Sequence, residues 1–243
     1  MRVVFADISK RFIAVAVILA VFAGLYNASV SMALNRWKRQ MFSPGLTNKT
    51  VIIDPGHGGA DPGAISGKLR EADLNMKLAL VLKKQLESKH VRVKLTRDGQ
   101  DGLVPDQAMS YLERWLILEK RKRFALDQRG HMLISIHVNS NPDKKTSGGI
   151  VFYSDGISRG LAVSVQNQLN SIGIRHRQIE QGNFTIITGN VMPSVLVEAG
   201  FITNKHDTDL LTSKPELVAT AICNGLEDYA RNLKSKTTGN GGL

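Results

Sequence analysis

The sequence predicts an α/β domain built on a mostly parallel, mixed sheet with helices on both faces, preceded by an N-terminal hydrophobic helix. Two observations lead to this expectation. Strand-like apolar runs alternate with helical periods along residues 50–233, and such alternation favours a parallel sheet covered on both sides. The 243 residues give room for a single good-sized domain plus an extra segment.

The first half of the predicted domain holds two strand–helix pairs. Thr50–Asp54 is a short apolar run that ends in a glycine-rich turn, which predicts a strand. Glu71–Ser88 has a leucine at every fourth position from Leu74, which predicts a helix. Val91–Thr96 alternates as a strand, and Gln107–Arg129 predicts a long helix with a strongly charged face. Its basic run, residues 120–123, is expected to be solvated or to meet an anionic wall or a partner.

The second half continues the alternation and closes with a helix. Proline is tolerated in the first turn of a helix, so Pro215 is compatible with that closing element. The predicted elements are strands at Met132–Val138 and Gly149–Ser154, a helix at Ile157–Ile172, a short buried strand at Ser194–Glu198, and a helix at Lys214–Leu233, followed by a Gly- and Thr-rich flexible tail at 234–243.

The N-terminus carries the pattern of an export signal. An almost unbroken apolar run over residues 12–25 follows Lys10 and Arg11. Residues 1–34 are therefore expected to be a signal peptide, cleaved near Ser31-Met32-Ala33, or a retained membrane anchor. Residues 35–49 predict a linker. We expect an exported, extracytoplasmic protein that is membrane-anchored or secreted to the cell wall.

Composition narrows the class of partner and of metal site. Of the formal net charge of +11, residues 1–39 carry +5, and the remaining +6 suits an anionic surface such as a cell wall or membrane headgroups. No recognised nucleic-acid-binding motif accompanies the charge, so no nucleic-acid partner is expected. Because Cys223 is the single cysteine, an intrachain disulfide and a cysteine-based zinc cluster are both excluded.

Residues able to bind a metal follow three of the predicted strands. His57 comes just after the first strand, His137 ends the third, and Glu198 ends the last. Ligands collect at the carboxyl ends of such strands. Glu71 begins the first helix. Each residue alone has an ordinary structural explanation. Together, two histidines and a carboxylate form a recognised catalytic zinc set that leaves a position for water, and another carboxylate can serve as general base.

Four motifs then resemble one known family. The segments VIIDPGHGGADPGA, READLN, LISIHVNS and VLVEAGFITN are similar, in the same order, to those of the zinc-dependent N-acetylmuramoyl-L-alanine amidases (Amidase_3). The resemblance covers about Thr50 to Leu233. It implies Zn²⁺ held by His57, Glu71 and His137, with Glu198 as catalytic acid/base. The implied reaction is hydrolysis of the amide between the lactyl group of muramic acid and L-alanine in peptidoglycan.

The chain is most similar to the spore-cortex members of this family. Their single-domain layout, N-terminal apolar segment and long basic helix are present here. The likeness implies a role in muramic δ-lactam formation and germination, with peptidoglycan as substrate, a membrane contact through the N-terminal segment, and a regulatory lipoprotein as a further partner.

Other features stay open at this point. Asn139 and Arg97 are expected either to contact substrate or to brace the site. Residues 179–192 are more polar than the matching stretch of many relatives, which bears on substrate selection. The alternative functions are a zinc peptidase acting on cell-wall peptides and a non-catalytic wall-binding protein.

Overall fold

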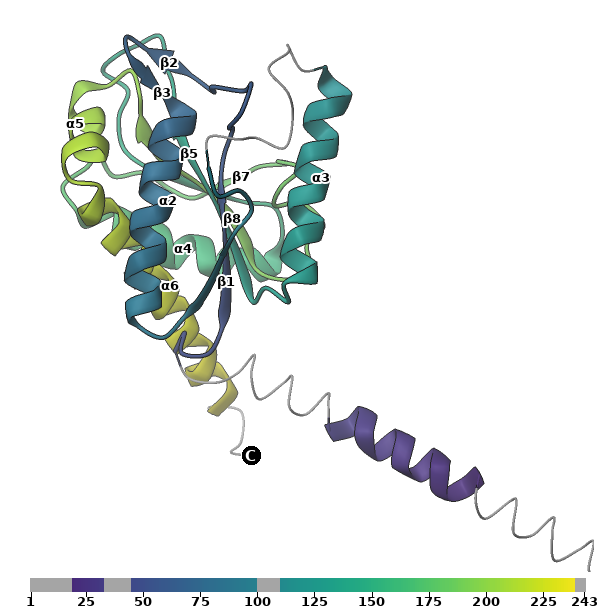
Figure 1. Ribbon diagram of the computed structural model, residues 1–243. Coiled ribbons are helices and arrows are strands. Elements are labelled where there is room, and N and C mark those ends of the chain that lie inside the picture. Colours follow the sequence, from purple (N-terminus) through teal and green to yellow (C-terminus); the bar gives the residue numbers. More distant parts are fainter. Residues whose placement is uncertain (1–18, 33–44, 100–109, 239–243) are drawn as a thin grey trace, which may run out of the picture. The chain divides into compact units, whose positions relative to one another are not determined.

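The computed structural model describes residues 19–32, 45–99 and 110–238 of the chain (Figure 1). The chain divides into two compact units, Met1–Phe42 and Ser43–Leu243. In the first unit, residues 19–32 form an exposed helix. Among the described residues, no helix combines the length and the apolar character needed to cross a membrane. The predicted apolar run begins at residue 12, outside the described residues.

A mixed six-stranded sheet forms the centre of the second unit. All neighbouring strands in it are parallel except β6 and β8, which are antiparallel. The order across the sheet is β4 (Arg92–Leu95), β1 (Thr50–Pro55), β5 (Met132–Asn139), β8 (Ser194–Phe201), β6 (Ile150–Tyr153) and β7 (Glu180–Gln181). A separate two-residue hairpin pairs β2 (Ile65–Ser66) with β3 (Leu69–Arg70).

Helices cover the two faces of the sheet unequally (Figure 1). One face carries α2 (Glu71–Ser88), α4 (Gly156–Asn170) and α6 (Pro215–Thr238), which pack on each other over the larger apolar core. The other face carries α3 (Tyr111–Asp127) and the segment 183–192, over a smaller cluster that includes Ile52, Leu133 and Leu196. Because side chains alternate along a strand, both faces of β1, β5 and β8 are apolar. The predicted three-layer α/β fold is confirmed.

Several boundaries differ from the sequence prediction. The last strand continues past Glu198 to Phe201, which pairs with Asn139 of β5 after a shift in register, and Ala199, Gly200 and Phe201 are all buried. A short polar helix, α5 (Lys205–Ser213), was not predicted because its sequence has no apolar period; Asn204 caps it. The closing helix runs on to Thr238. Leu46, in the predicted linker, is buried in the core, so the domain begins before Thr50.

Candidate metal centre

A glycine-rich turn after β1 presents the first histidine. His57 has a φ of 59°, in the left-handed region that costs free energy for a side-chain-bearing residue. Gly56 beside it needs to be glycine because a Cβ there would lie 2.2 Å from His137 Nε2. The turn thus brings its backbone against the second histidine, which no larger residue at position 56 would allow.

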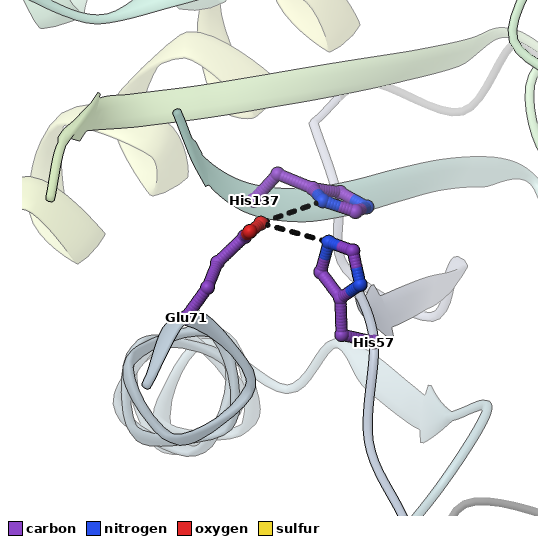
Figure 2. A group of neighbouring side chains, drawn as sticks. All are labelled: His57, Glu71 and His137. Carbon is purple, nitrogen blue, oxygen red and sulfur yellow. Dashed lines mark hydrogen bonds and ion pairs between the residues drawn. The ribbon is translucent and has the colours of Figure 1, made fainter. Parts of the chain in front are cut away.

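Glu71 joins the two histidines. It is the first residue of α2, and its Oε2 accepts a hydrogen bond of 2.9 Å from the Ala64 backbone N–H. Its Oε1 lies 3.1 Å from His57 Nε2 and 2.9 Å from His137 Nδ1. Figure 2 shows the carboxylate reaching from the end of the helix to both rings. The fixed Oε2 leaves Oε1 directed at the space between the histidines.

The three side chains have the geometry of a metal site. Their ligand atoms all lie within 4.8 Å of one another. Two imidazole nitrogens and one carboxylate oxygen are a donor set that Zn²⁺ uses in catalytic sites. The three donors face one another closely enough to hold one divalent cation, so the residues present fit such an ion.

Asp61, which the sequence analysis missed, orients the first histidine. Its Oδ2 lies 2.8 Å from His57 Nδ1, which leaves Nε2 facing Glu71. A carboxylate on the distal nitrogen of a ligating histidine fixes the ring and its tautomer. Burial by itself would lower the pKa of His57, but the hydrogen bonds with Asp61 and Glu71 raise it to about 9. The signal was present in the sequence, four residues after the histidine.

Glu198 lies beside the triad on the next strand. It pairs in register with His137, so both side chains project from the same face of the sheet. Its Oε2 is buried, and no described residue hydrogen-bonds it. Burial is the main cause that raises the pKa of Glu198 to about 7. Such a carboxyl can accept and return a proton near neutral pH.

A buried ion pair holds the turn that carries His57. Arg121 of α3 and Asp54 of β1 lie 3.1 Å apart and are 4% and 1% exposed. Arg121 also donates to the carbonyls of Pro55 and His57. The basic run 120–123 was expected to be solvated or to meet an anionic wall or a partner, and this expectation is wrong for Arg121, which is buried. It occupies the inward stripe of α3 together with Ile117 and Ala125.

Arg97 and Asn139, expected either to contact substrate or to brace the site, both form hydrogen bonds with backbone groups. Arg97 is 5% exposed and donates to the carbonyls of Pro55 and Gly56, beside His57, and to the carbonyl of Ala72 in α2. Asn139 ends β5, and its side chain accepts a hydrogen bond from the Ser140 N–H. The contacts of Arg97 hold the backbone beside His57, whereas that of Asn139 is local to its own turn. Asn75, not predicted, donates to Glu71 Oε1 and to the Gly56 carbonyl.

A cavity of about 360 Å³ opens beside the two histidines. Residues of α3 line it, and so do residues 183–186, which belong to the polar stretch 179–192 that was connected with substrate selection. The lining residues are His57, Gly58, Asp61, Arg114, Ile117, Leu118, Arg121, His137, Asn183, Phe184, Thr185, Ile186 and Leu196.

An α/β domain with a two-histidine, one-glutamate centre, a partly buried glutamate beside it and an adjoining cavity has the make-up of a metal-dependent hydrolase. Residues 51–228 match the sequence pattern of the N-acetylmuramoyl-L-alanine amidase family. The chain belongs to this family and is an amidase of that type. The family predicted from the four motifs is thereby confirmed.

Individual relatives agree with the assignment. The chain is 37% identical over 190 residues to the uncharacterized protein YqiI of Bacillus subtilis (strain 168), covering 76% of this chain and 86% of that protein. It is 31% identical over 201 residues to the germination-specific N-acetylmuramoyl-L-alanine amidase of the same organism, covering 79% and 84%. The solved CwlD amidase of Clostridioides difficile, in complex with the GerS lipoprotein, superposes with a TM-score of 0.70 at 31% identity, covering 75% and 98%.

Proposed function

We propose that this amidase uses Zn²⁺ held by His57, Glu71 and His137, with Glu198 as its catalytic acid/base. The substrate bond is the amide between the lactyl group of muramic acid and L-alanine. The observation that carries the proposal is the set of three ligand atoms within 4.8 Å, with the unpartnered carboxyl of Glu198 on the neighbouring strand.

Each residue has a distinct task in the reaction. When bound, the metal supplies Lewis acidity, which polarises the scissile carbonyl and lowers the pKa of water. Glu198 accepts the proton of the attacking water, since its carboxyl is close to the triad and is not committed to another hydrogen bond. The same carboxyl then returns the proton to the leaving alanine nitrogen. Asp61 holds the ring of His57 in place through these steps.

The cellular setting that we propose follows the relatives. One is a germination-specific amidase, and another was solved with a lipoprotein. These support action outside the cytoplasm on spore-cortex peptidoglycan, with removal of stem peptides before muramic δ-lactam forms. They also support a lipoprotein partner. The basic and apolar pattern of residues 10–25 supports export and a membrane contact through the N-terminal segment.

Zinc analysis combined with mass spectrometry of digested cortex tests this function. Wild-type protein should contain zinc and release peptides whose new amine terminus is L-alanine. Glu198→Ala should retain the metal and lose cleavage. Glu216→Ala, which removes an exposed carboxylate on α6, is the matched control and should behave as wild type.

Two results would contradict the proposal. New amine termini at residues other than L-alanine would indicate the alternative zinc peptidase. A protein that binds the wall without zinc and without cleavage would indicate the alternative wall-binding protein.

A further inference from the structure

The cavity beside the metal centre has one wall that is a single stripe of α3. Arg114, Ile117, Leu118 and Arg121 all line it, at intervals of three and four residues that place them on one side of a helix. Leu196 and Ile186 add further apolar surface. The stripe therefore presents an apolar middle between two guanidinium groups.

The two arginines of the stripe differ in what they already bind. Arg121 is buried and is committed to Asp54 and to the carbonyls of Pro55 and His57. Arg114 is exposed, and no described residue forms a hydrogen bond or ion pair with its guanidinium. The charge of Arg114 helps to lower the pKa of Asp61, but the Asp61 carboxylate is hydrogen-bonded to His57 and to the Gly63 N–H rather than to Arg114. Arg114 is thus available for an anion that enters the cavity.

The distance from the metal centre to Arg114 is close to the length of a short peptide. Seven residues of helix separate it from Arg121, which is about 10 Å along the axis. Arg121 touches the carbonyl of the metal-binding His57 at 2.8 Å. Two extended residues of a peptide span about 7 Å, and an arginine side chain can reach over the remainder. A peptide leaving the metal centre along α3 would bring the residue after L-alanine close to Arg114.

We propose that this cavity is the stem-peptide subsite and that Arg114 binds a free carboxylate on the residue after L-alanine. The proposal rests on the amidase function above. It makes the enzyme selective for acidic stem peptides. Asn183 and Phe184 also line the cavity. The ring of Phe184 packs edge-on against that of Phe152, with 5.0 Å between the ring centroids. An apolar ring and a side-chain amide suit contact with a peptide chain.

Kinetics on two muramoyl peptides test the subsite. They share L-alanine and differ only in the next residue, γ-linked D-glutamate with a free α-carboxylate or its α-amide. For the wild-type zinc enzyme, kcat/KM should be about 10- to 100-fold higher for the acid, the range of a hydrogen bond to a charged group. Arg114→Gln should remove that preference by slowing only the acid, and Arg114→Lys should keep part of it. Arg123→Gln, on the solvent side of α3, is the matched control.

The outcomes separate this proposal from the amidase function itself. Equal kcat/KM for acid and amide in the wild type, or an equal loss for both in Arg114→Gln, would overturn the subsite. Calorimetry with Glu198→Gln proteins reads the same preference from binding alone. An enzyme that cleaves neither peptide therefore contradicts the proposed function, whereas the affinities for acid and amide still decide the role of Arg114.

Discussion

Replacing Arg121 with methionine should destabilise the domain strongly. The change removes one partner of a pair whose members are 4% and 1% exposed, and it leaves the carboxylate of Asp54 buried. Removing one partner of a buried pair costs about 3–5 kcal/mol. Since 1 kcal/mol shifts the melting temperature of a domain of this size by about 2–4 °C, Tm should fall by about 6–20 °C. Thr96 and Ser135 still donate to Asp54, which favours the lower part of that range.

The pH dependence of the loss follows from Asp54. Burial would raise the pKa of Asp54, but Arg121, Ser135 and Thr96 together hold it below its ordinary value of 3.8. A carboxyl with a lowered pKa stabilises the fold above its unfolded pKa, and that contribution is lost as pH falls through the folded pKa. The difference between wild type and Arg121→Met should therefore be largest near neutral pH and shrink in acid.

Urea denaturation of metal-free protein, followed by circular dichroism, measures these differences. Arg123→Met, 78% exposed on the same helix, should change the free energy of unfolding by less than about 0.5 kcal/mol. The double variant Asp54→Asn/Arg121→Met should recover part of the single-variant loss, because no buried charge remains. A loss below about 1 kcal/mol for Arg121→Met, or strict additivity in the double variant, would refute the reasoning.

Three further predictions concern the metal centre. Gly56→Ala should lower zinc content with a folded circular-dichroism spectrum retained, because the new Cβ would lie 2.2 Å from His137 Nε2; full zinc occupancy would contradict this. Zinc affinity, measured by chelator competition, should rise as the pH increases from 6.5 to about 9. His57 must lose its proton before it can bind the metal, and its pKa is raised from 6.5 to about 9; an affinity that does not change with pH would refute this. Metal-free wild type should lose about 3 kcal/mol of stability as pH rises from 4.5 to about 7, the span over which the unfolded but not the folded Glu198 ionises. In urea titrations, the stability of metal-free Glu198→Gln should not fall in this way as pH rises. A fall equal to that of wild type would contradict the prediction.

Three of the four candidate site residues could be predicted from the sequence because they lie at or just after the carboxyl ends of apolar runs. His57 follows β1, and His137 and Glu198 pair with each other near the carboxyl ends of β5 and β8, so the parallel register of these strands brings the three residues together. Glu71 could be predicted only from the motifs. An acidic residue at the start of a helix is favoured by the helix dipole alone, so its position gives no separate sign of a metal site. That its carboxylate turns toward the histidines depends on the packing of α2 against β5, which local sequence does not determine.

The supporting residues were harder to predict because their roles depend on helix rotation. The run from Lys120 to Arg123 has four cations, and its charge alone does not show which one faces inward. The spacing to Ile117 and Leu118 was the available signal, because Arg121 follows them by four and three residues on the same side of the helix. Arg97 is a similar case: its partners are backbone carbonyls, which leave no trace in side-chain patterns.

The unequal covering of the sheet has a consequence for how this enzyme can diversify. The larger core lies under α2, α4 and α6, away from the cavity, whereas the cavity is bounded by α3 and residues 183–186 over a small apolar cluster. Surface positions of that thinner layer can be exchanged without disturbing the packing that keeps the domain folded. New peptide preferences can therefore arise on one side of the sheet while the other side conserves the fold.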